Sequence, residues 1–195
     1  KKPDYLTLQQ AAACAGSGMV CASLFQNSVL GRKDIVLIIG ASGGVGTLAV
    51  QMAKATGAYT IAVCSGKNME LVKLLGADEV IDYQSSSFSN VLRNKSQKSD
   101  IVLDCVGGKD VEAQSMKVLK KTGKFKTIVG PVKYIGDQRL GWFGITKMFS
   151  YILWHWLLSF IKGPRYEFVA GTKTALPYFK EMLQQQAIVP VIDKV

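Results

Sequence analysis

Glycine and other small residues fill the six positions that join an apolar run to an amphipathic one near residue 40. These positions follow the pattern G-x-G-x-x-G with alanine in the first place, and they are Ala41, Ser42, Gly43, Gly44, Val45 and Gly46. In such a turn the first small residue permits the sharp bend, the second glycine admits a pyrophosphate, and the third lets the helix pack closely on the sheet. Because the N–H groups of the first helical turn and the helix dipole attract anions, the segment predicts a site for the pyrophosphate of a dinucleotide.

The residues on either side of the glycine segment show how specific this signal is. Residues 35–40 are apolar, as a buried strand requires, and Val45, Leu48 and Met52 mark one face of a helix. A strand before the motif and a helix after it form the context that a dinucleotide turn requires. A tight turn that binds no ligand is the alternative. A Walker phosphate loop is excluded, because no Gly-Lys-Ser or Gly-Lys-Thr follows.

The end of the second expected strand bears on which dinucleotide binds. Proteins that prefer NAD(H) place an Asp or Glu about 20 residues after the motif, where it binds the ribose 2′-hydroxyl. Here that stretch contains Ser65 and Lys67 and no acidic residue. A hydroxyl and an ammonium group favour a 2′-phosphate, which a carboxylate repels. The sequence therefore favours NADP(H) over NAD(H), and the alternative is that Lys67 is an ordinary solvated lysine.

Strands and helices alternate along the rest of the chain. A helix is expected from Leu8, capped by Thr7 and interrupted near residues 16–18, and Gly57 and Gly76 are expected to end two later helices. Strands are expected at 35–40, 59–64, 78–83, 100–107, 124–130, 165–171 and 188–193, with further helices at 68–75, 85–94, 111–123 and 174–186. This alternation predicts an α/β fold, namely a Rossmann doubly wound parallel sheet with helices on both faces.

Charge and cysteine usage narrow the class of protein. The 195 residues carry a formal net charge of +10, which attracts nucleotides, nucleic acids and acidic membranes alike. The four cysteines form no Cys-x-x-Cys pair and His155 is the single histidine, so no metal site is expected. Scattered cysteines fit a reducing compartment, which predicts an intracellular, cytoplasmic protein. Both chain ends resemble the interior of a protein, which predicts that the sequence is part of a longer one.

Four segments, in order along the chain, resemble the medium-chain dehydrogenase/reductase superfamily, in its zinc-independent quinone-oxidoreductase or zeta-crystallin-like branch. They are "VLIIGASGGVGTLAVQMAKATGA", "KLLGADEVIDY", "DIVLDCVGG" and "VPVID". The resemblance implies an enzyme with a GroES-like catalytic barrel and an inserted Rossmann cofactor domain. Residues 1–195 are expected to form that cofactor domain, with a linking helix at 6–27. Because the barrel is largely absent, this chain is expected to bind a dinucleotide but to be inactive by itself.

The resemblance also implies roles for residues outside the glycine segment. Tyr83 matches a tyrosine beside the adenosine phosphate, and a packed strand-end aromatic is the alternative. Cys21 stands where relatives carry a threonine near the nicotinamide, and no proton donor is identified, so the catalytic residues are unknown. The strand ends implied to approach the nicotinamide ribose and ring carry Cys105, Val106, Gly107, Val129 and Gly130. The implied reaction is metal-free hydride transfer from C4 of NADPH to a small electrophile such as a quinone, an enone or an aldehyde.

Residues 140–163, "LGWFGITKMFSYILWHWLLSFIKG", form an apolar segment with three tryptophans. Polar residues such as Lys147 and His155 interrupt it, so one or two helices packed on the domain are expected rather than a membrane span. The resemblance places this region near a homodimer contact. The alternative is a surface that touches a membrane or a lipid droplet, because interfacial segments favour tryptophan with flanking basic residues.

A run of lysines without an acidic residue follows the fourth strand, and it comprises Lys117, Lys120, Lys121, Lys124, Lys126 and Lys133. A solvated face, or a partial neutraliser of the cofactor phosphates, is expected. RNA binding is the disfavoured alternative, because only Phe125 lies among these lysines as an aromatic residue. The sequence therefore leaves three functions open: an NADPH-dependent oxidoreductase, which the intact glycine segment favours, a non-catalytic adaptor that keeps the fold, and an RNA binder.

Overall fold

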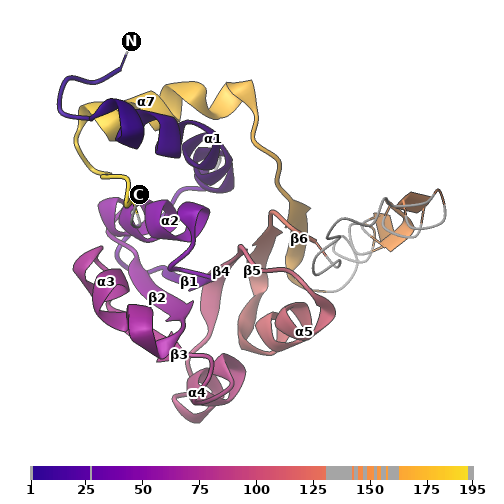
Figure 1. Cartoon of the computed structure of the whole chain (residues 1–195). Helices are drawn as coiled ribbons and strands as arrows, with labels where there is room; N and C mark the ends of the chain where they lie inside the picture. Colours follow the sequence, from indigo (N-terminus) through magenta and orange to yellow (C-terminus); the bar gives the residue numbers. More distant parts are fainter. Residues whose placement is uncertain are drawn as a thin grey trace.

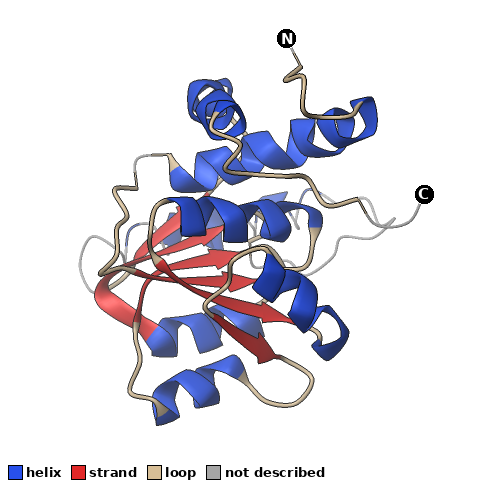
Figure 2. Ribbon diagram, turned by 90° about the vertical axis from the view of Figure 1, so that its left-hand side faces the viewer, coloured by secondary structure: helices blue, strands red, loops and turns tan. Residues whose placement is uncertain are grey.

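The computed structural model contains a parallel sheet of six strands with helices on both of its faces (Figures 1 and 2). The structure describes residues 2–26, 28–130 and 163–192, together with 142, 145, 146, 149–151, 153, 154 and 157. The strands, in chain order, are β1 (Ile35–Ile39), β2 (Tyr59–Cys64), β3 (Glu79–Asp82), β4 (Ser99–Asp104), β5 (Leu119–Thr127) and β6 (Arg165–Phe168). Their spatial order, β3-β2-β1-β4-β5-β6, is that of a doubly wound Rossmann sheet, and it confirms the predicted fold class.

The helices divide between the two faces of the sheet (Figure 2). Strand β1 shows why both faces need cover: Val36 and Ile38 pack toward one face, whereas Leu37 and Ile39 pack toward the other. Such strands, apolar on both sides, are typical of parallel sheets. One face is covered by α1 (Leu8–Phe25), α2 (Gly44–Ala55), α3 (Met69–Leu74) and α7 (Leu176–Gln184), and the other by α4 (Phe88–Asn94) and α5 (Lys109–Val118).

Helix α1 begins as predicted but is not interrupted. Thr7 and Gln10 form a capping box, in which each side chain accepts a hydrogen bond from the backbone N–H of the other residue. The expected break near residues 16–18 is wrong, since the helix is continuous from Leu8 to Phe25. Gly18 faces α7, and a β-carbon there would overlap the ring of Phe179. The glycine therefore permits close helix packing rather than a bend.

Two other expectations along the chain are also wrong. The helix expected at 111–123 ends at Val118, and β5 already begins at Leu119. Leu119 pairs with Ser99 of β4 and Lys120 forms an ion pair with Asp100, so contacts distant in sequence turn a helix-forming segment into a strand. The strand expected at 188–193 is absent over the described residues 188–192.

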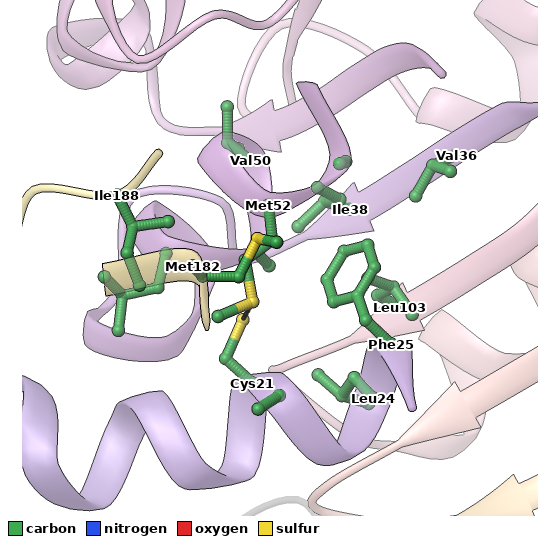
Figure 3. Packing of buried hydrophobic residues seen from close by; sticks show 14 of the residues in the cluster. Cys21, Leu24, Phe25, Val36, Ile38, Val50, Met52, Leu103, Met182 and Ile188 are labelled. Carbon is green, nitrogen blue, oxygen red and sulfur yellow. Dashed lines mark hydrogen bonds between the residues drawn. The ribbon is translucent and has the colours of Figure 1, made fainter. Parts of the chain in front are cut away.

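The segment after α7 is instead tied to α2 by one side chain. The amide of Gln51 accepts a hydrogen bond from the N–H of Val189 at 2.7 Å and donates one to its carbonyl at 3.0 Å. On the same side of the sheet, the Cys21 thiol lies 3.4 Å from the sulfur of Met52 in a cluster that includes Met182 (Figure 3). This packing joins α1 and α7 to α2, the helix that follows the glycine turn.

Candidate dinucleotide-binding site

The turn between β1 and α2 lies at the carboxyl edge of the sheet, next to the point where the strand order reverses. Its left-handed residue is Gly40, with a φ of +78°. The sharp bend assigned to Ala41 therefore occurs one residue earlier, and Ala41 is a buried core residue. The bend falls at Gly40 for a steric reason, because a positive φ is open to glycine and costly for alanine.

Gly46 and Gly43 are glycines for different reasons. A β-carbon on Gly46 would overlap the carbonyl oxygen of Gly40 and lie 2.7 Å from the Cα of Ala41, so the fold itself excludes any larger residue. A β-carbon on Gly43 would meet only the oxygen of Gly40, at 3.4 Å, which is an ordinary contact. Gly43 also has a φ of −81°, which every residue type can adopt. The fold therefore requires glycine at position 46 but not at position 43.

The amino end of α2 is open to a ligand. Gly43 is its N-cap residue and provides no side-chain cap, and Gly43 and Gly44 are exposed while Val45 is half-buried. N–H groups of an uncapped first turn can bind an anion, and the helix dipole adds to the attraction. A pocket of about 320 Å³ lies in front of them, lined by Ser42, Thr47 and Asn68 among others.

A second pocket, of about 420 Å³, lies on the α4–α5 side of the same edge. Its walls come from Gly40 after β1, Val63 of β2, Val106 after β4 and Phe88 of α4. Tyr83 also lines it, and this side chain is 58% exposed. The predicted site residue Tyr83 thus borders a cavity next to the glycine turn rather than lying packed in the core.

The end of β2 brings together residues that the sequence named and one that it missed. Asn68 donates hydrogen bonds to the hydroxyls of both Ser42 and Ser65, at 3.0 and 3.2 Å. Ser65 is largely buried, and Lys67 is exposed on the short 3-10 turn η1 (Gly66–Asn68). Asn68 therefore links the glycine turn to the end of β2. Asn68 directly follows Lys67, and this adjacency to a predicted site residue is the feature of the sequence that could have identified it.

One carboxylate also reaches this edge, from the end of β3. A β-carbon on Gly66 would lie 2.9 Å from Oδ2 of Asp82, so the carboxyl group lies against η1. Asp82 accepts hydrogen bonds from the N–H of Gln84 at 2.9 Å and the hydroxyl of Ser85 at 2.8 Å. These donors, the Gln84 N–H first, lower the pKa of Asp82 below its ordinary value, so the group is charged at neutral pH.

The ends of β4 and β5 lie side by side in the other half of the sheet. Strand pairing places Asp104 opposite Thr127, so the predicted residues 105–107 and 129–130 follow two adjacent strands. Gly107 and Gly130 both have positive φ, of +77° and +75°. Burial raises the pKa of the half-buried Cys105 thiol to about 12, so this thiol is neutral at physiological pH.

Two features named from the sequence contain side chains that are buried rather than exposed. Cys21 is fully buried against Met52, and burial raises the pKa of its thiol well above the ordinary value. The lysine run is not a uniformly solvated face, because Lys126 is 2% exposed and donates hydrogen bonds to the carbonyl of Leu24 and the hydroxyl of Ser28. Lys133 lies outside the described residues.

The apolar segment 140–163 is described only in part. Tyr151 donates a hydrogen bond to Glu112 of α5 at 2.9 Å. Exposed apolar side chains on the described helical residues are Trp142, Phe149, Leu153, Trp154 and Leu157. Lys147 and His155 lie outside the described residues. Within the part of the chain that the structure describes, no helix combines the length and hydropathy needed to cross a membrane, and no cluster of three or more potential metal ligands occurs.

Comparisons with known proteins agree with this fold. Residues 44–141 match the family model described as zinc-binding dehydrogenase. The chain is 37% identical to the mitochondrial NAD(P)H oxidoreductase RTN4IP1 of Bos taurus, over 99% of this chain and 50% of that protein. It is 36% identical to the chloroplast envelope quinone oxidoreductase homolog of Arabidopsis thaliana, over 55% of this chain and 35% of that one.

A solved structure supports the same relationship. The quinone oxidoreductase from Coxiella burnetii superposes with a TM-score of 0.72 and 26% identity, over 98% of this chain and 54% of that chain. The chain thus spans about half the length of the relatives that it matches. The matching family model, the strand order and the glycine turn place the chain in the zinc-binding dehydrogenase family, as a cofactor-binding domain of the medium-chain dehydrogenase/reductase superfamily.

Proposed function

We propose that this chain is the dinucleotide-binding part of an NADP(H)-dependent oxidoreductase, with the pyrophosphate bound at the amino end of α2. The observation that carries this proposal is the contrast between Gly46, which the fold requires, and Gly43, which it does not. A glycine that the fold does not need, exposed beside the N–H groups of an uncapped helix, fits a backbone that must approach a ligand closely.

The two pockets fit the two sides of such a ligand. The pocket in front of α2 accepts phosphate oxygens through backbone N–H groups and the Ser42 hydroxyl. The apolar pocket between Tyr83, Phe88 and Val106 suits the adenine ring, which is flat and largely apolar. NADPH supplies a hydride at C4 of its nicotinamide when it is bound. The role of the residues that line the two pockets is to bind the dinucleotide and to orient it along the edge of the sheet.

The preference for NADP(H) is supported by the side chains at the end of β2. The hydroxyls of Ser42 and Ser65 accept hydrogen bonds from Asn68 and so keep their own O–H groups to donate, and the exposed Lys67 ammonium adds positive charge. Asp82 is the one described carboxylate lying against this turn, and it is hydrogen-bonded to Gln84 and Ser85. A 2′-phosphate therefore meets donors and a cation here, and the negative charge of Asp82 opposes part of their attraction.

The relatives that the chain matches are about twice its length, so we propose that substrate turnover requires a protein of that length. Relatives that it resembles are named as NAD(P)H and quinone oxidoreductases. We therefore propose a small electrophilic substrate such as a quinone, an enone or an aldehyde, reduced without zinc. We also propose that the full protein forms a homodimer through the region of residues 140–163.

Titration calorimetry of the Gly43→Ala variant with NADPH tests the proposal. We expect its affinity to fall by at least about tenfold, because a new methyl group occupies the place of the pyrophosphate, while the thermal midpoint stays near that of the wild type. The matched control is Gly16→Ala, at an exposed helix position with no atom within 4 Å of the added carbon, which should bind as the wild type does. Undiminished binding by Gly43→Ala would refute the site.

A second candidate function is supported by the exposed apolar side chains of the segment 140–163. Trp142, Phe149, Leu153, Trp154 and Leu157 are all at least 47% exposed, in a protein with a net charge of +10. Tryptophan and positive charge together favour the surface of an anionic membrane. This function suits the adaptor alternative as well as a membrane-associated cytoplasmic enzyme.

Flotation with vesicles of phosphatidylcholine and phosphatidylserine tests the second candidate. The wild type should float with the vesicles, and Trp154→Ser should reduce the floated fraction severalfold. Tyr59→Ser, at a half-exposed aromatic residue of β2 far along the chain from this segment, serves as the control. The membrane function is excluded if the wild type stays in the unbound fraction. RNA binding has less support, because Lys126 is buried and Lys120 is paired with Asp100.

A further inference from the structure

A buried hydroxyl organises the carboxyl edge of the second half of the sheet. Thr127, the last residue of β5, is fully buried, and its hydroxyl donates a hydrogen bond to Oδ2 of Asp104 at 2.9 Å. The Thr127 hydroxyl oxygen also accepts hydrogen bonds from the N–H groups of Val129 at 3.2 Å and Gly130 at 2.9 Å. A threonine hydroxyl has one donor and two acceptor positions, so every one of them is used here.

Asp104 connects this hydroxyl to the neighbouring turn. Its other carboxylate oxygen accepts hydrogen bonds from the N–H groups of Val106 at 3.0 Å and Gly107 at 2.8 Å. Asp104 is 1% exposed, so water cannot replace these bonds. One threonine and one aspartate therefore bind four backbone N–H groups in the turns that follow β4 and β5.

Direct contacts lock the two turns to each other as well. The N–H of Gly108 donates to the carbonyl of Gly130 at 3.2 Å. A β-carbon on Gly107 would lie 2.8 Å from the Cβ of Val129, so the two turns pack without space for a further atom. The shape of this edge thus depends on buried bonds rather than on exposed side chains.

The strand order indicates what this edge is for. In a sheet ordered 3-2-1-4-5-6, each half of three strands receives one mononucleotide, and the dinucleotide crosses at the point where the order reverses. The pocket proposed for the adenine ring and the end of β2 belong largely to the first half. The turn at residues 128–130 belongs to the second half, beyond β4, where the nicotinamide side of the ligand would lie.

We propose that Thr127 is a positioning residue: it holds the Val129–Gly130 turn in the one shape that receives the second nucleotide of the bound dinucleotide, with Asp104 as its partner. This inference rests on the proposed dinucleotide function. Without the hydroxyl, the N–H groups of Val129 and Gly130 lose their acceptor, and the turn rearranges to regain one. The first half of the sheet is untouched by that change.

Calorimetry with two ligands separates this role from a general loss of stability. One ligand is NADPH, and the other is 2′,5′-ADP, which has the adenosine half and the 2′-phosphate but no nicotinamide. For Thr127→Val, which keeps the size of the side chain and removes the hydroxyl, we expect NADPH affinity to fall about tenfold and 2′,5′-ADP affinity to change less than about twofold. Thr127→Ser restores the hydroxyl and should restore NADPH affinity.

Thr60→Val is the matched control, because Thr60 is equally buried but lies near the start of β2, at the opposite edge of the sheet. It should bind both ligands as the wild type does, whatever its thermal midpoint. Equal losses for the two ligands in Thr127→Val, no loss at all, or no rescue by Thr127→Ser would overturn the positioning role. If the wild-type chain binds neither ligand, the proposed function fails and this inference fails with it.

Discussion

The two halves of the sheet present carboxyl edges that are built by different means. In the first half, the edge is formed by exposed backbone at Gly43 and Gly44 and by polar side chains at the end of β2. In the second half, the edge is formed by two turns. Their backbone N–H groups donate hydrogen bonds to Asp104 and Thr127, which are both almost fully buried. The shape of the first edge depends on glycines, which have no side chains. The shape of the second edge depends on hydrogen bonds buried in the core.

The two edges should therefore be damaged by different kinds of substitution. Adding atoms should damage the first edge, because its function depends on empty space beside the backbone. Removing polar atoms should damage the second, because buried N–H groups that lose their acceptors cost about 1–3 kcal/mol each. Glycines near both edges share a steric role, so substitutions there give the largest expected effects.

Gly46→Val should have the largest effect on stability. The added carbons would overlap the Gly40 carbonyl and crowd the backbone of Ala41, and backbone atoms cannot move aside as a flexible side chain can. We expect a loss of about 3 kcal/mol or more in the free energy of unfolding, measured by urea denaturation. Gly31→Ala, with no atom within 4 Å of the added carbon, is the control. A wild-type midpoint for Gly46→Val would mean that α2 does not pack as described.

Gly107→Ala tests the steric part of the second edge. The residue has a φ of +77°, and its β-carbon would lie 2.8 Å from the Cβ of Val129 and 2.9 Å from the oxygen of Gly130. Left-handed backbone costs alanine about 1–2 kcal/mol, so we expect a loss of about 2 kcal/mol in thermal or urea unfolding once the clash is included. A change below about 0.5 kcal/mol would indicate that the two turns are not in contact.

Lys67→Glu should change specificity rather than stability. The ratio of NADPH to NADH affinity is expected to fall about tenfold, which corresponds to about 1.4 kcal/mol, because a carboxylate then faces the 2′-phosphate. Competition binding with both dinucleotides measures the ratio. Lys98→Glu makes the same charge change on an exposed residue just before β4, at the amino edge of the sheet, and should leave the ratio unaltered. If the wild type binds NADPH and NADH equally, the NADP(H) preference is wrong.

Cys105→Ala should have the smallest effect, and only at alkaline pH. Burial raises the pKa of this thiol from 9.0 to about 12, so above about pH 9 the unfolded chain releases a proton that the folded chain still holds. The contribution of this buried thiol to the free energy of unfolding is therefore fully present below pH 9, and it is lost as the pH rises toward 12. The variant should lose less stability than the wild type between pH 8 and 10.5 in urea titrations. Parallel curves would show that the thiol is not buried.

The fold was largely predictable because its signals are local. Thr7 and Gln10 have the spacing of a capping box, Gly57 and Gly76 lie just beyond the ends of α2 and α3 with positive φ, and the strands are continuous apolar runs. The errors have a common cause. Gly18 packs against Phe179 and Leu119 pairs with Ser99, and both partners are distant in the sequence, so local propensity misassigned both segments.

The residues of the candidate site carry a local sequence signal in its first half, whereas the side chains that hold the turns of its second half carry none. Glycine in a G-x-G-x-x-G pattern carries its own physical meaning, so Gly43 and Gly46 could be named from the sequence. Asp104 lies within "DCVGG", yet only the residues after it were named, because an aspartate at a strand end has many ordinary roles. Thr127 gave no signal at all, since its role depends on the strand pairing that sets it opposite Asp104.

Sequence alone determined the alternation of strands and helices, the glycine turn and the absence of an acidic residue at the end of β2, because each of these depends on residue type and spacing. Only the tertiary structure showed that position 43 has room for a side chain while position 46 has none. It also brought Thr127 and Asp104 together from β5 and β4. Steric room and buried hydrogen bonds are properties of neighbours in space, and a linear sequence does not specify which neighbours those are.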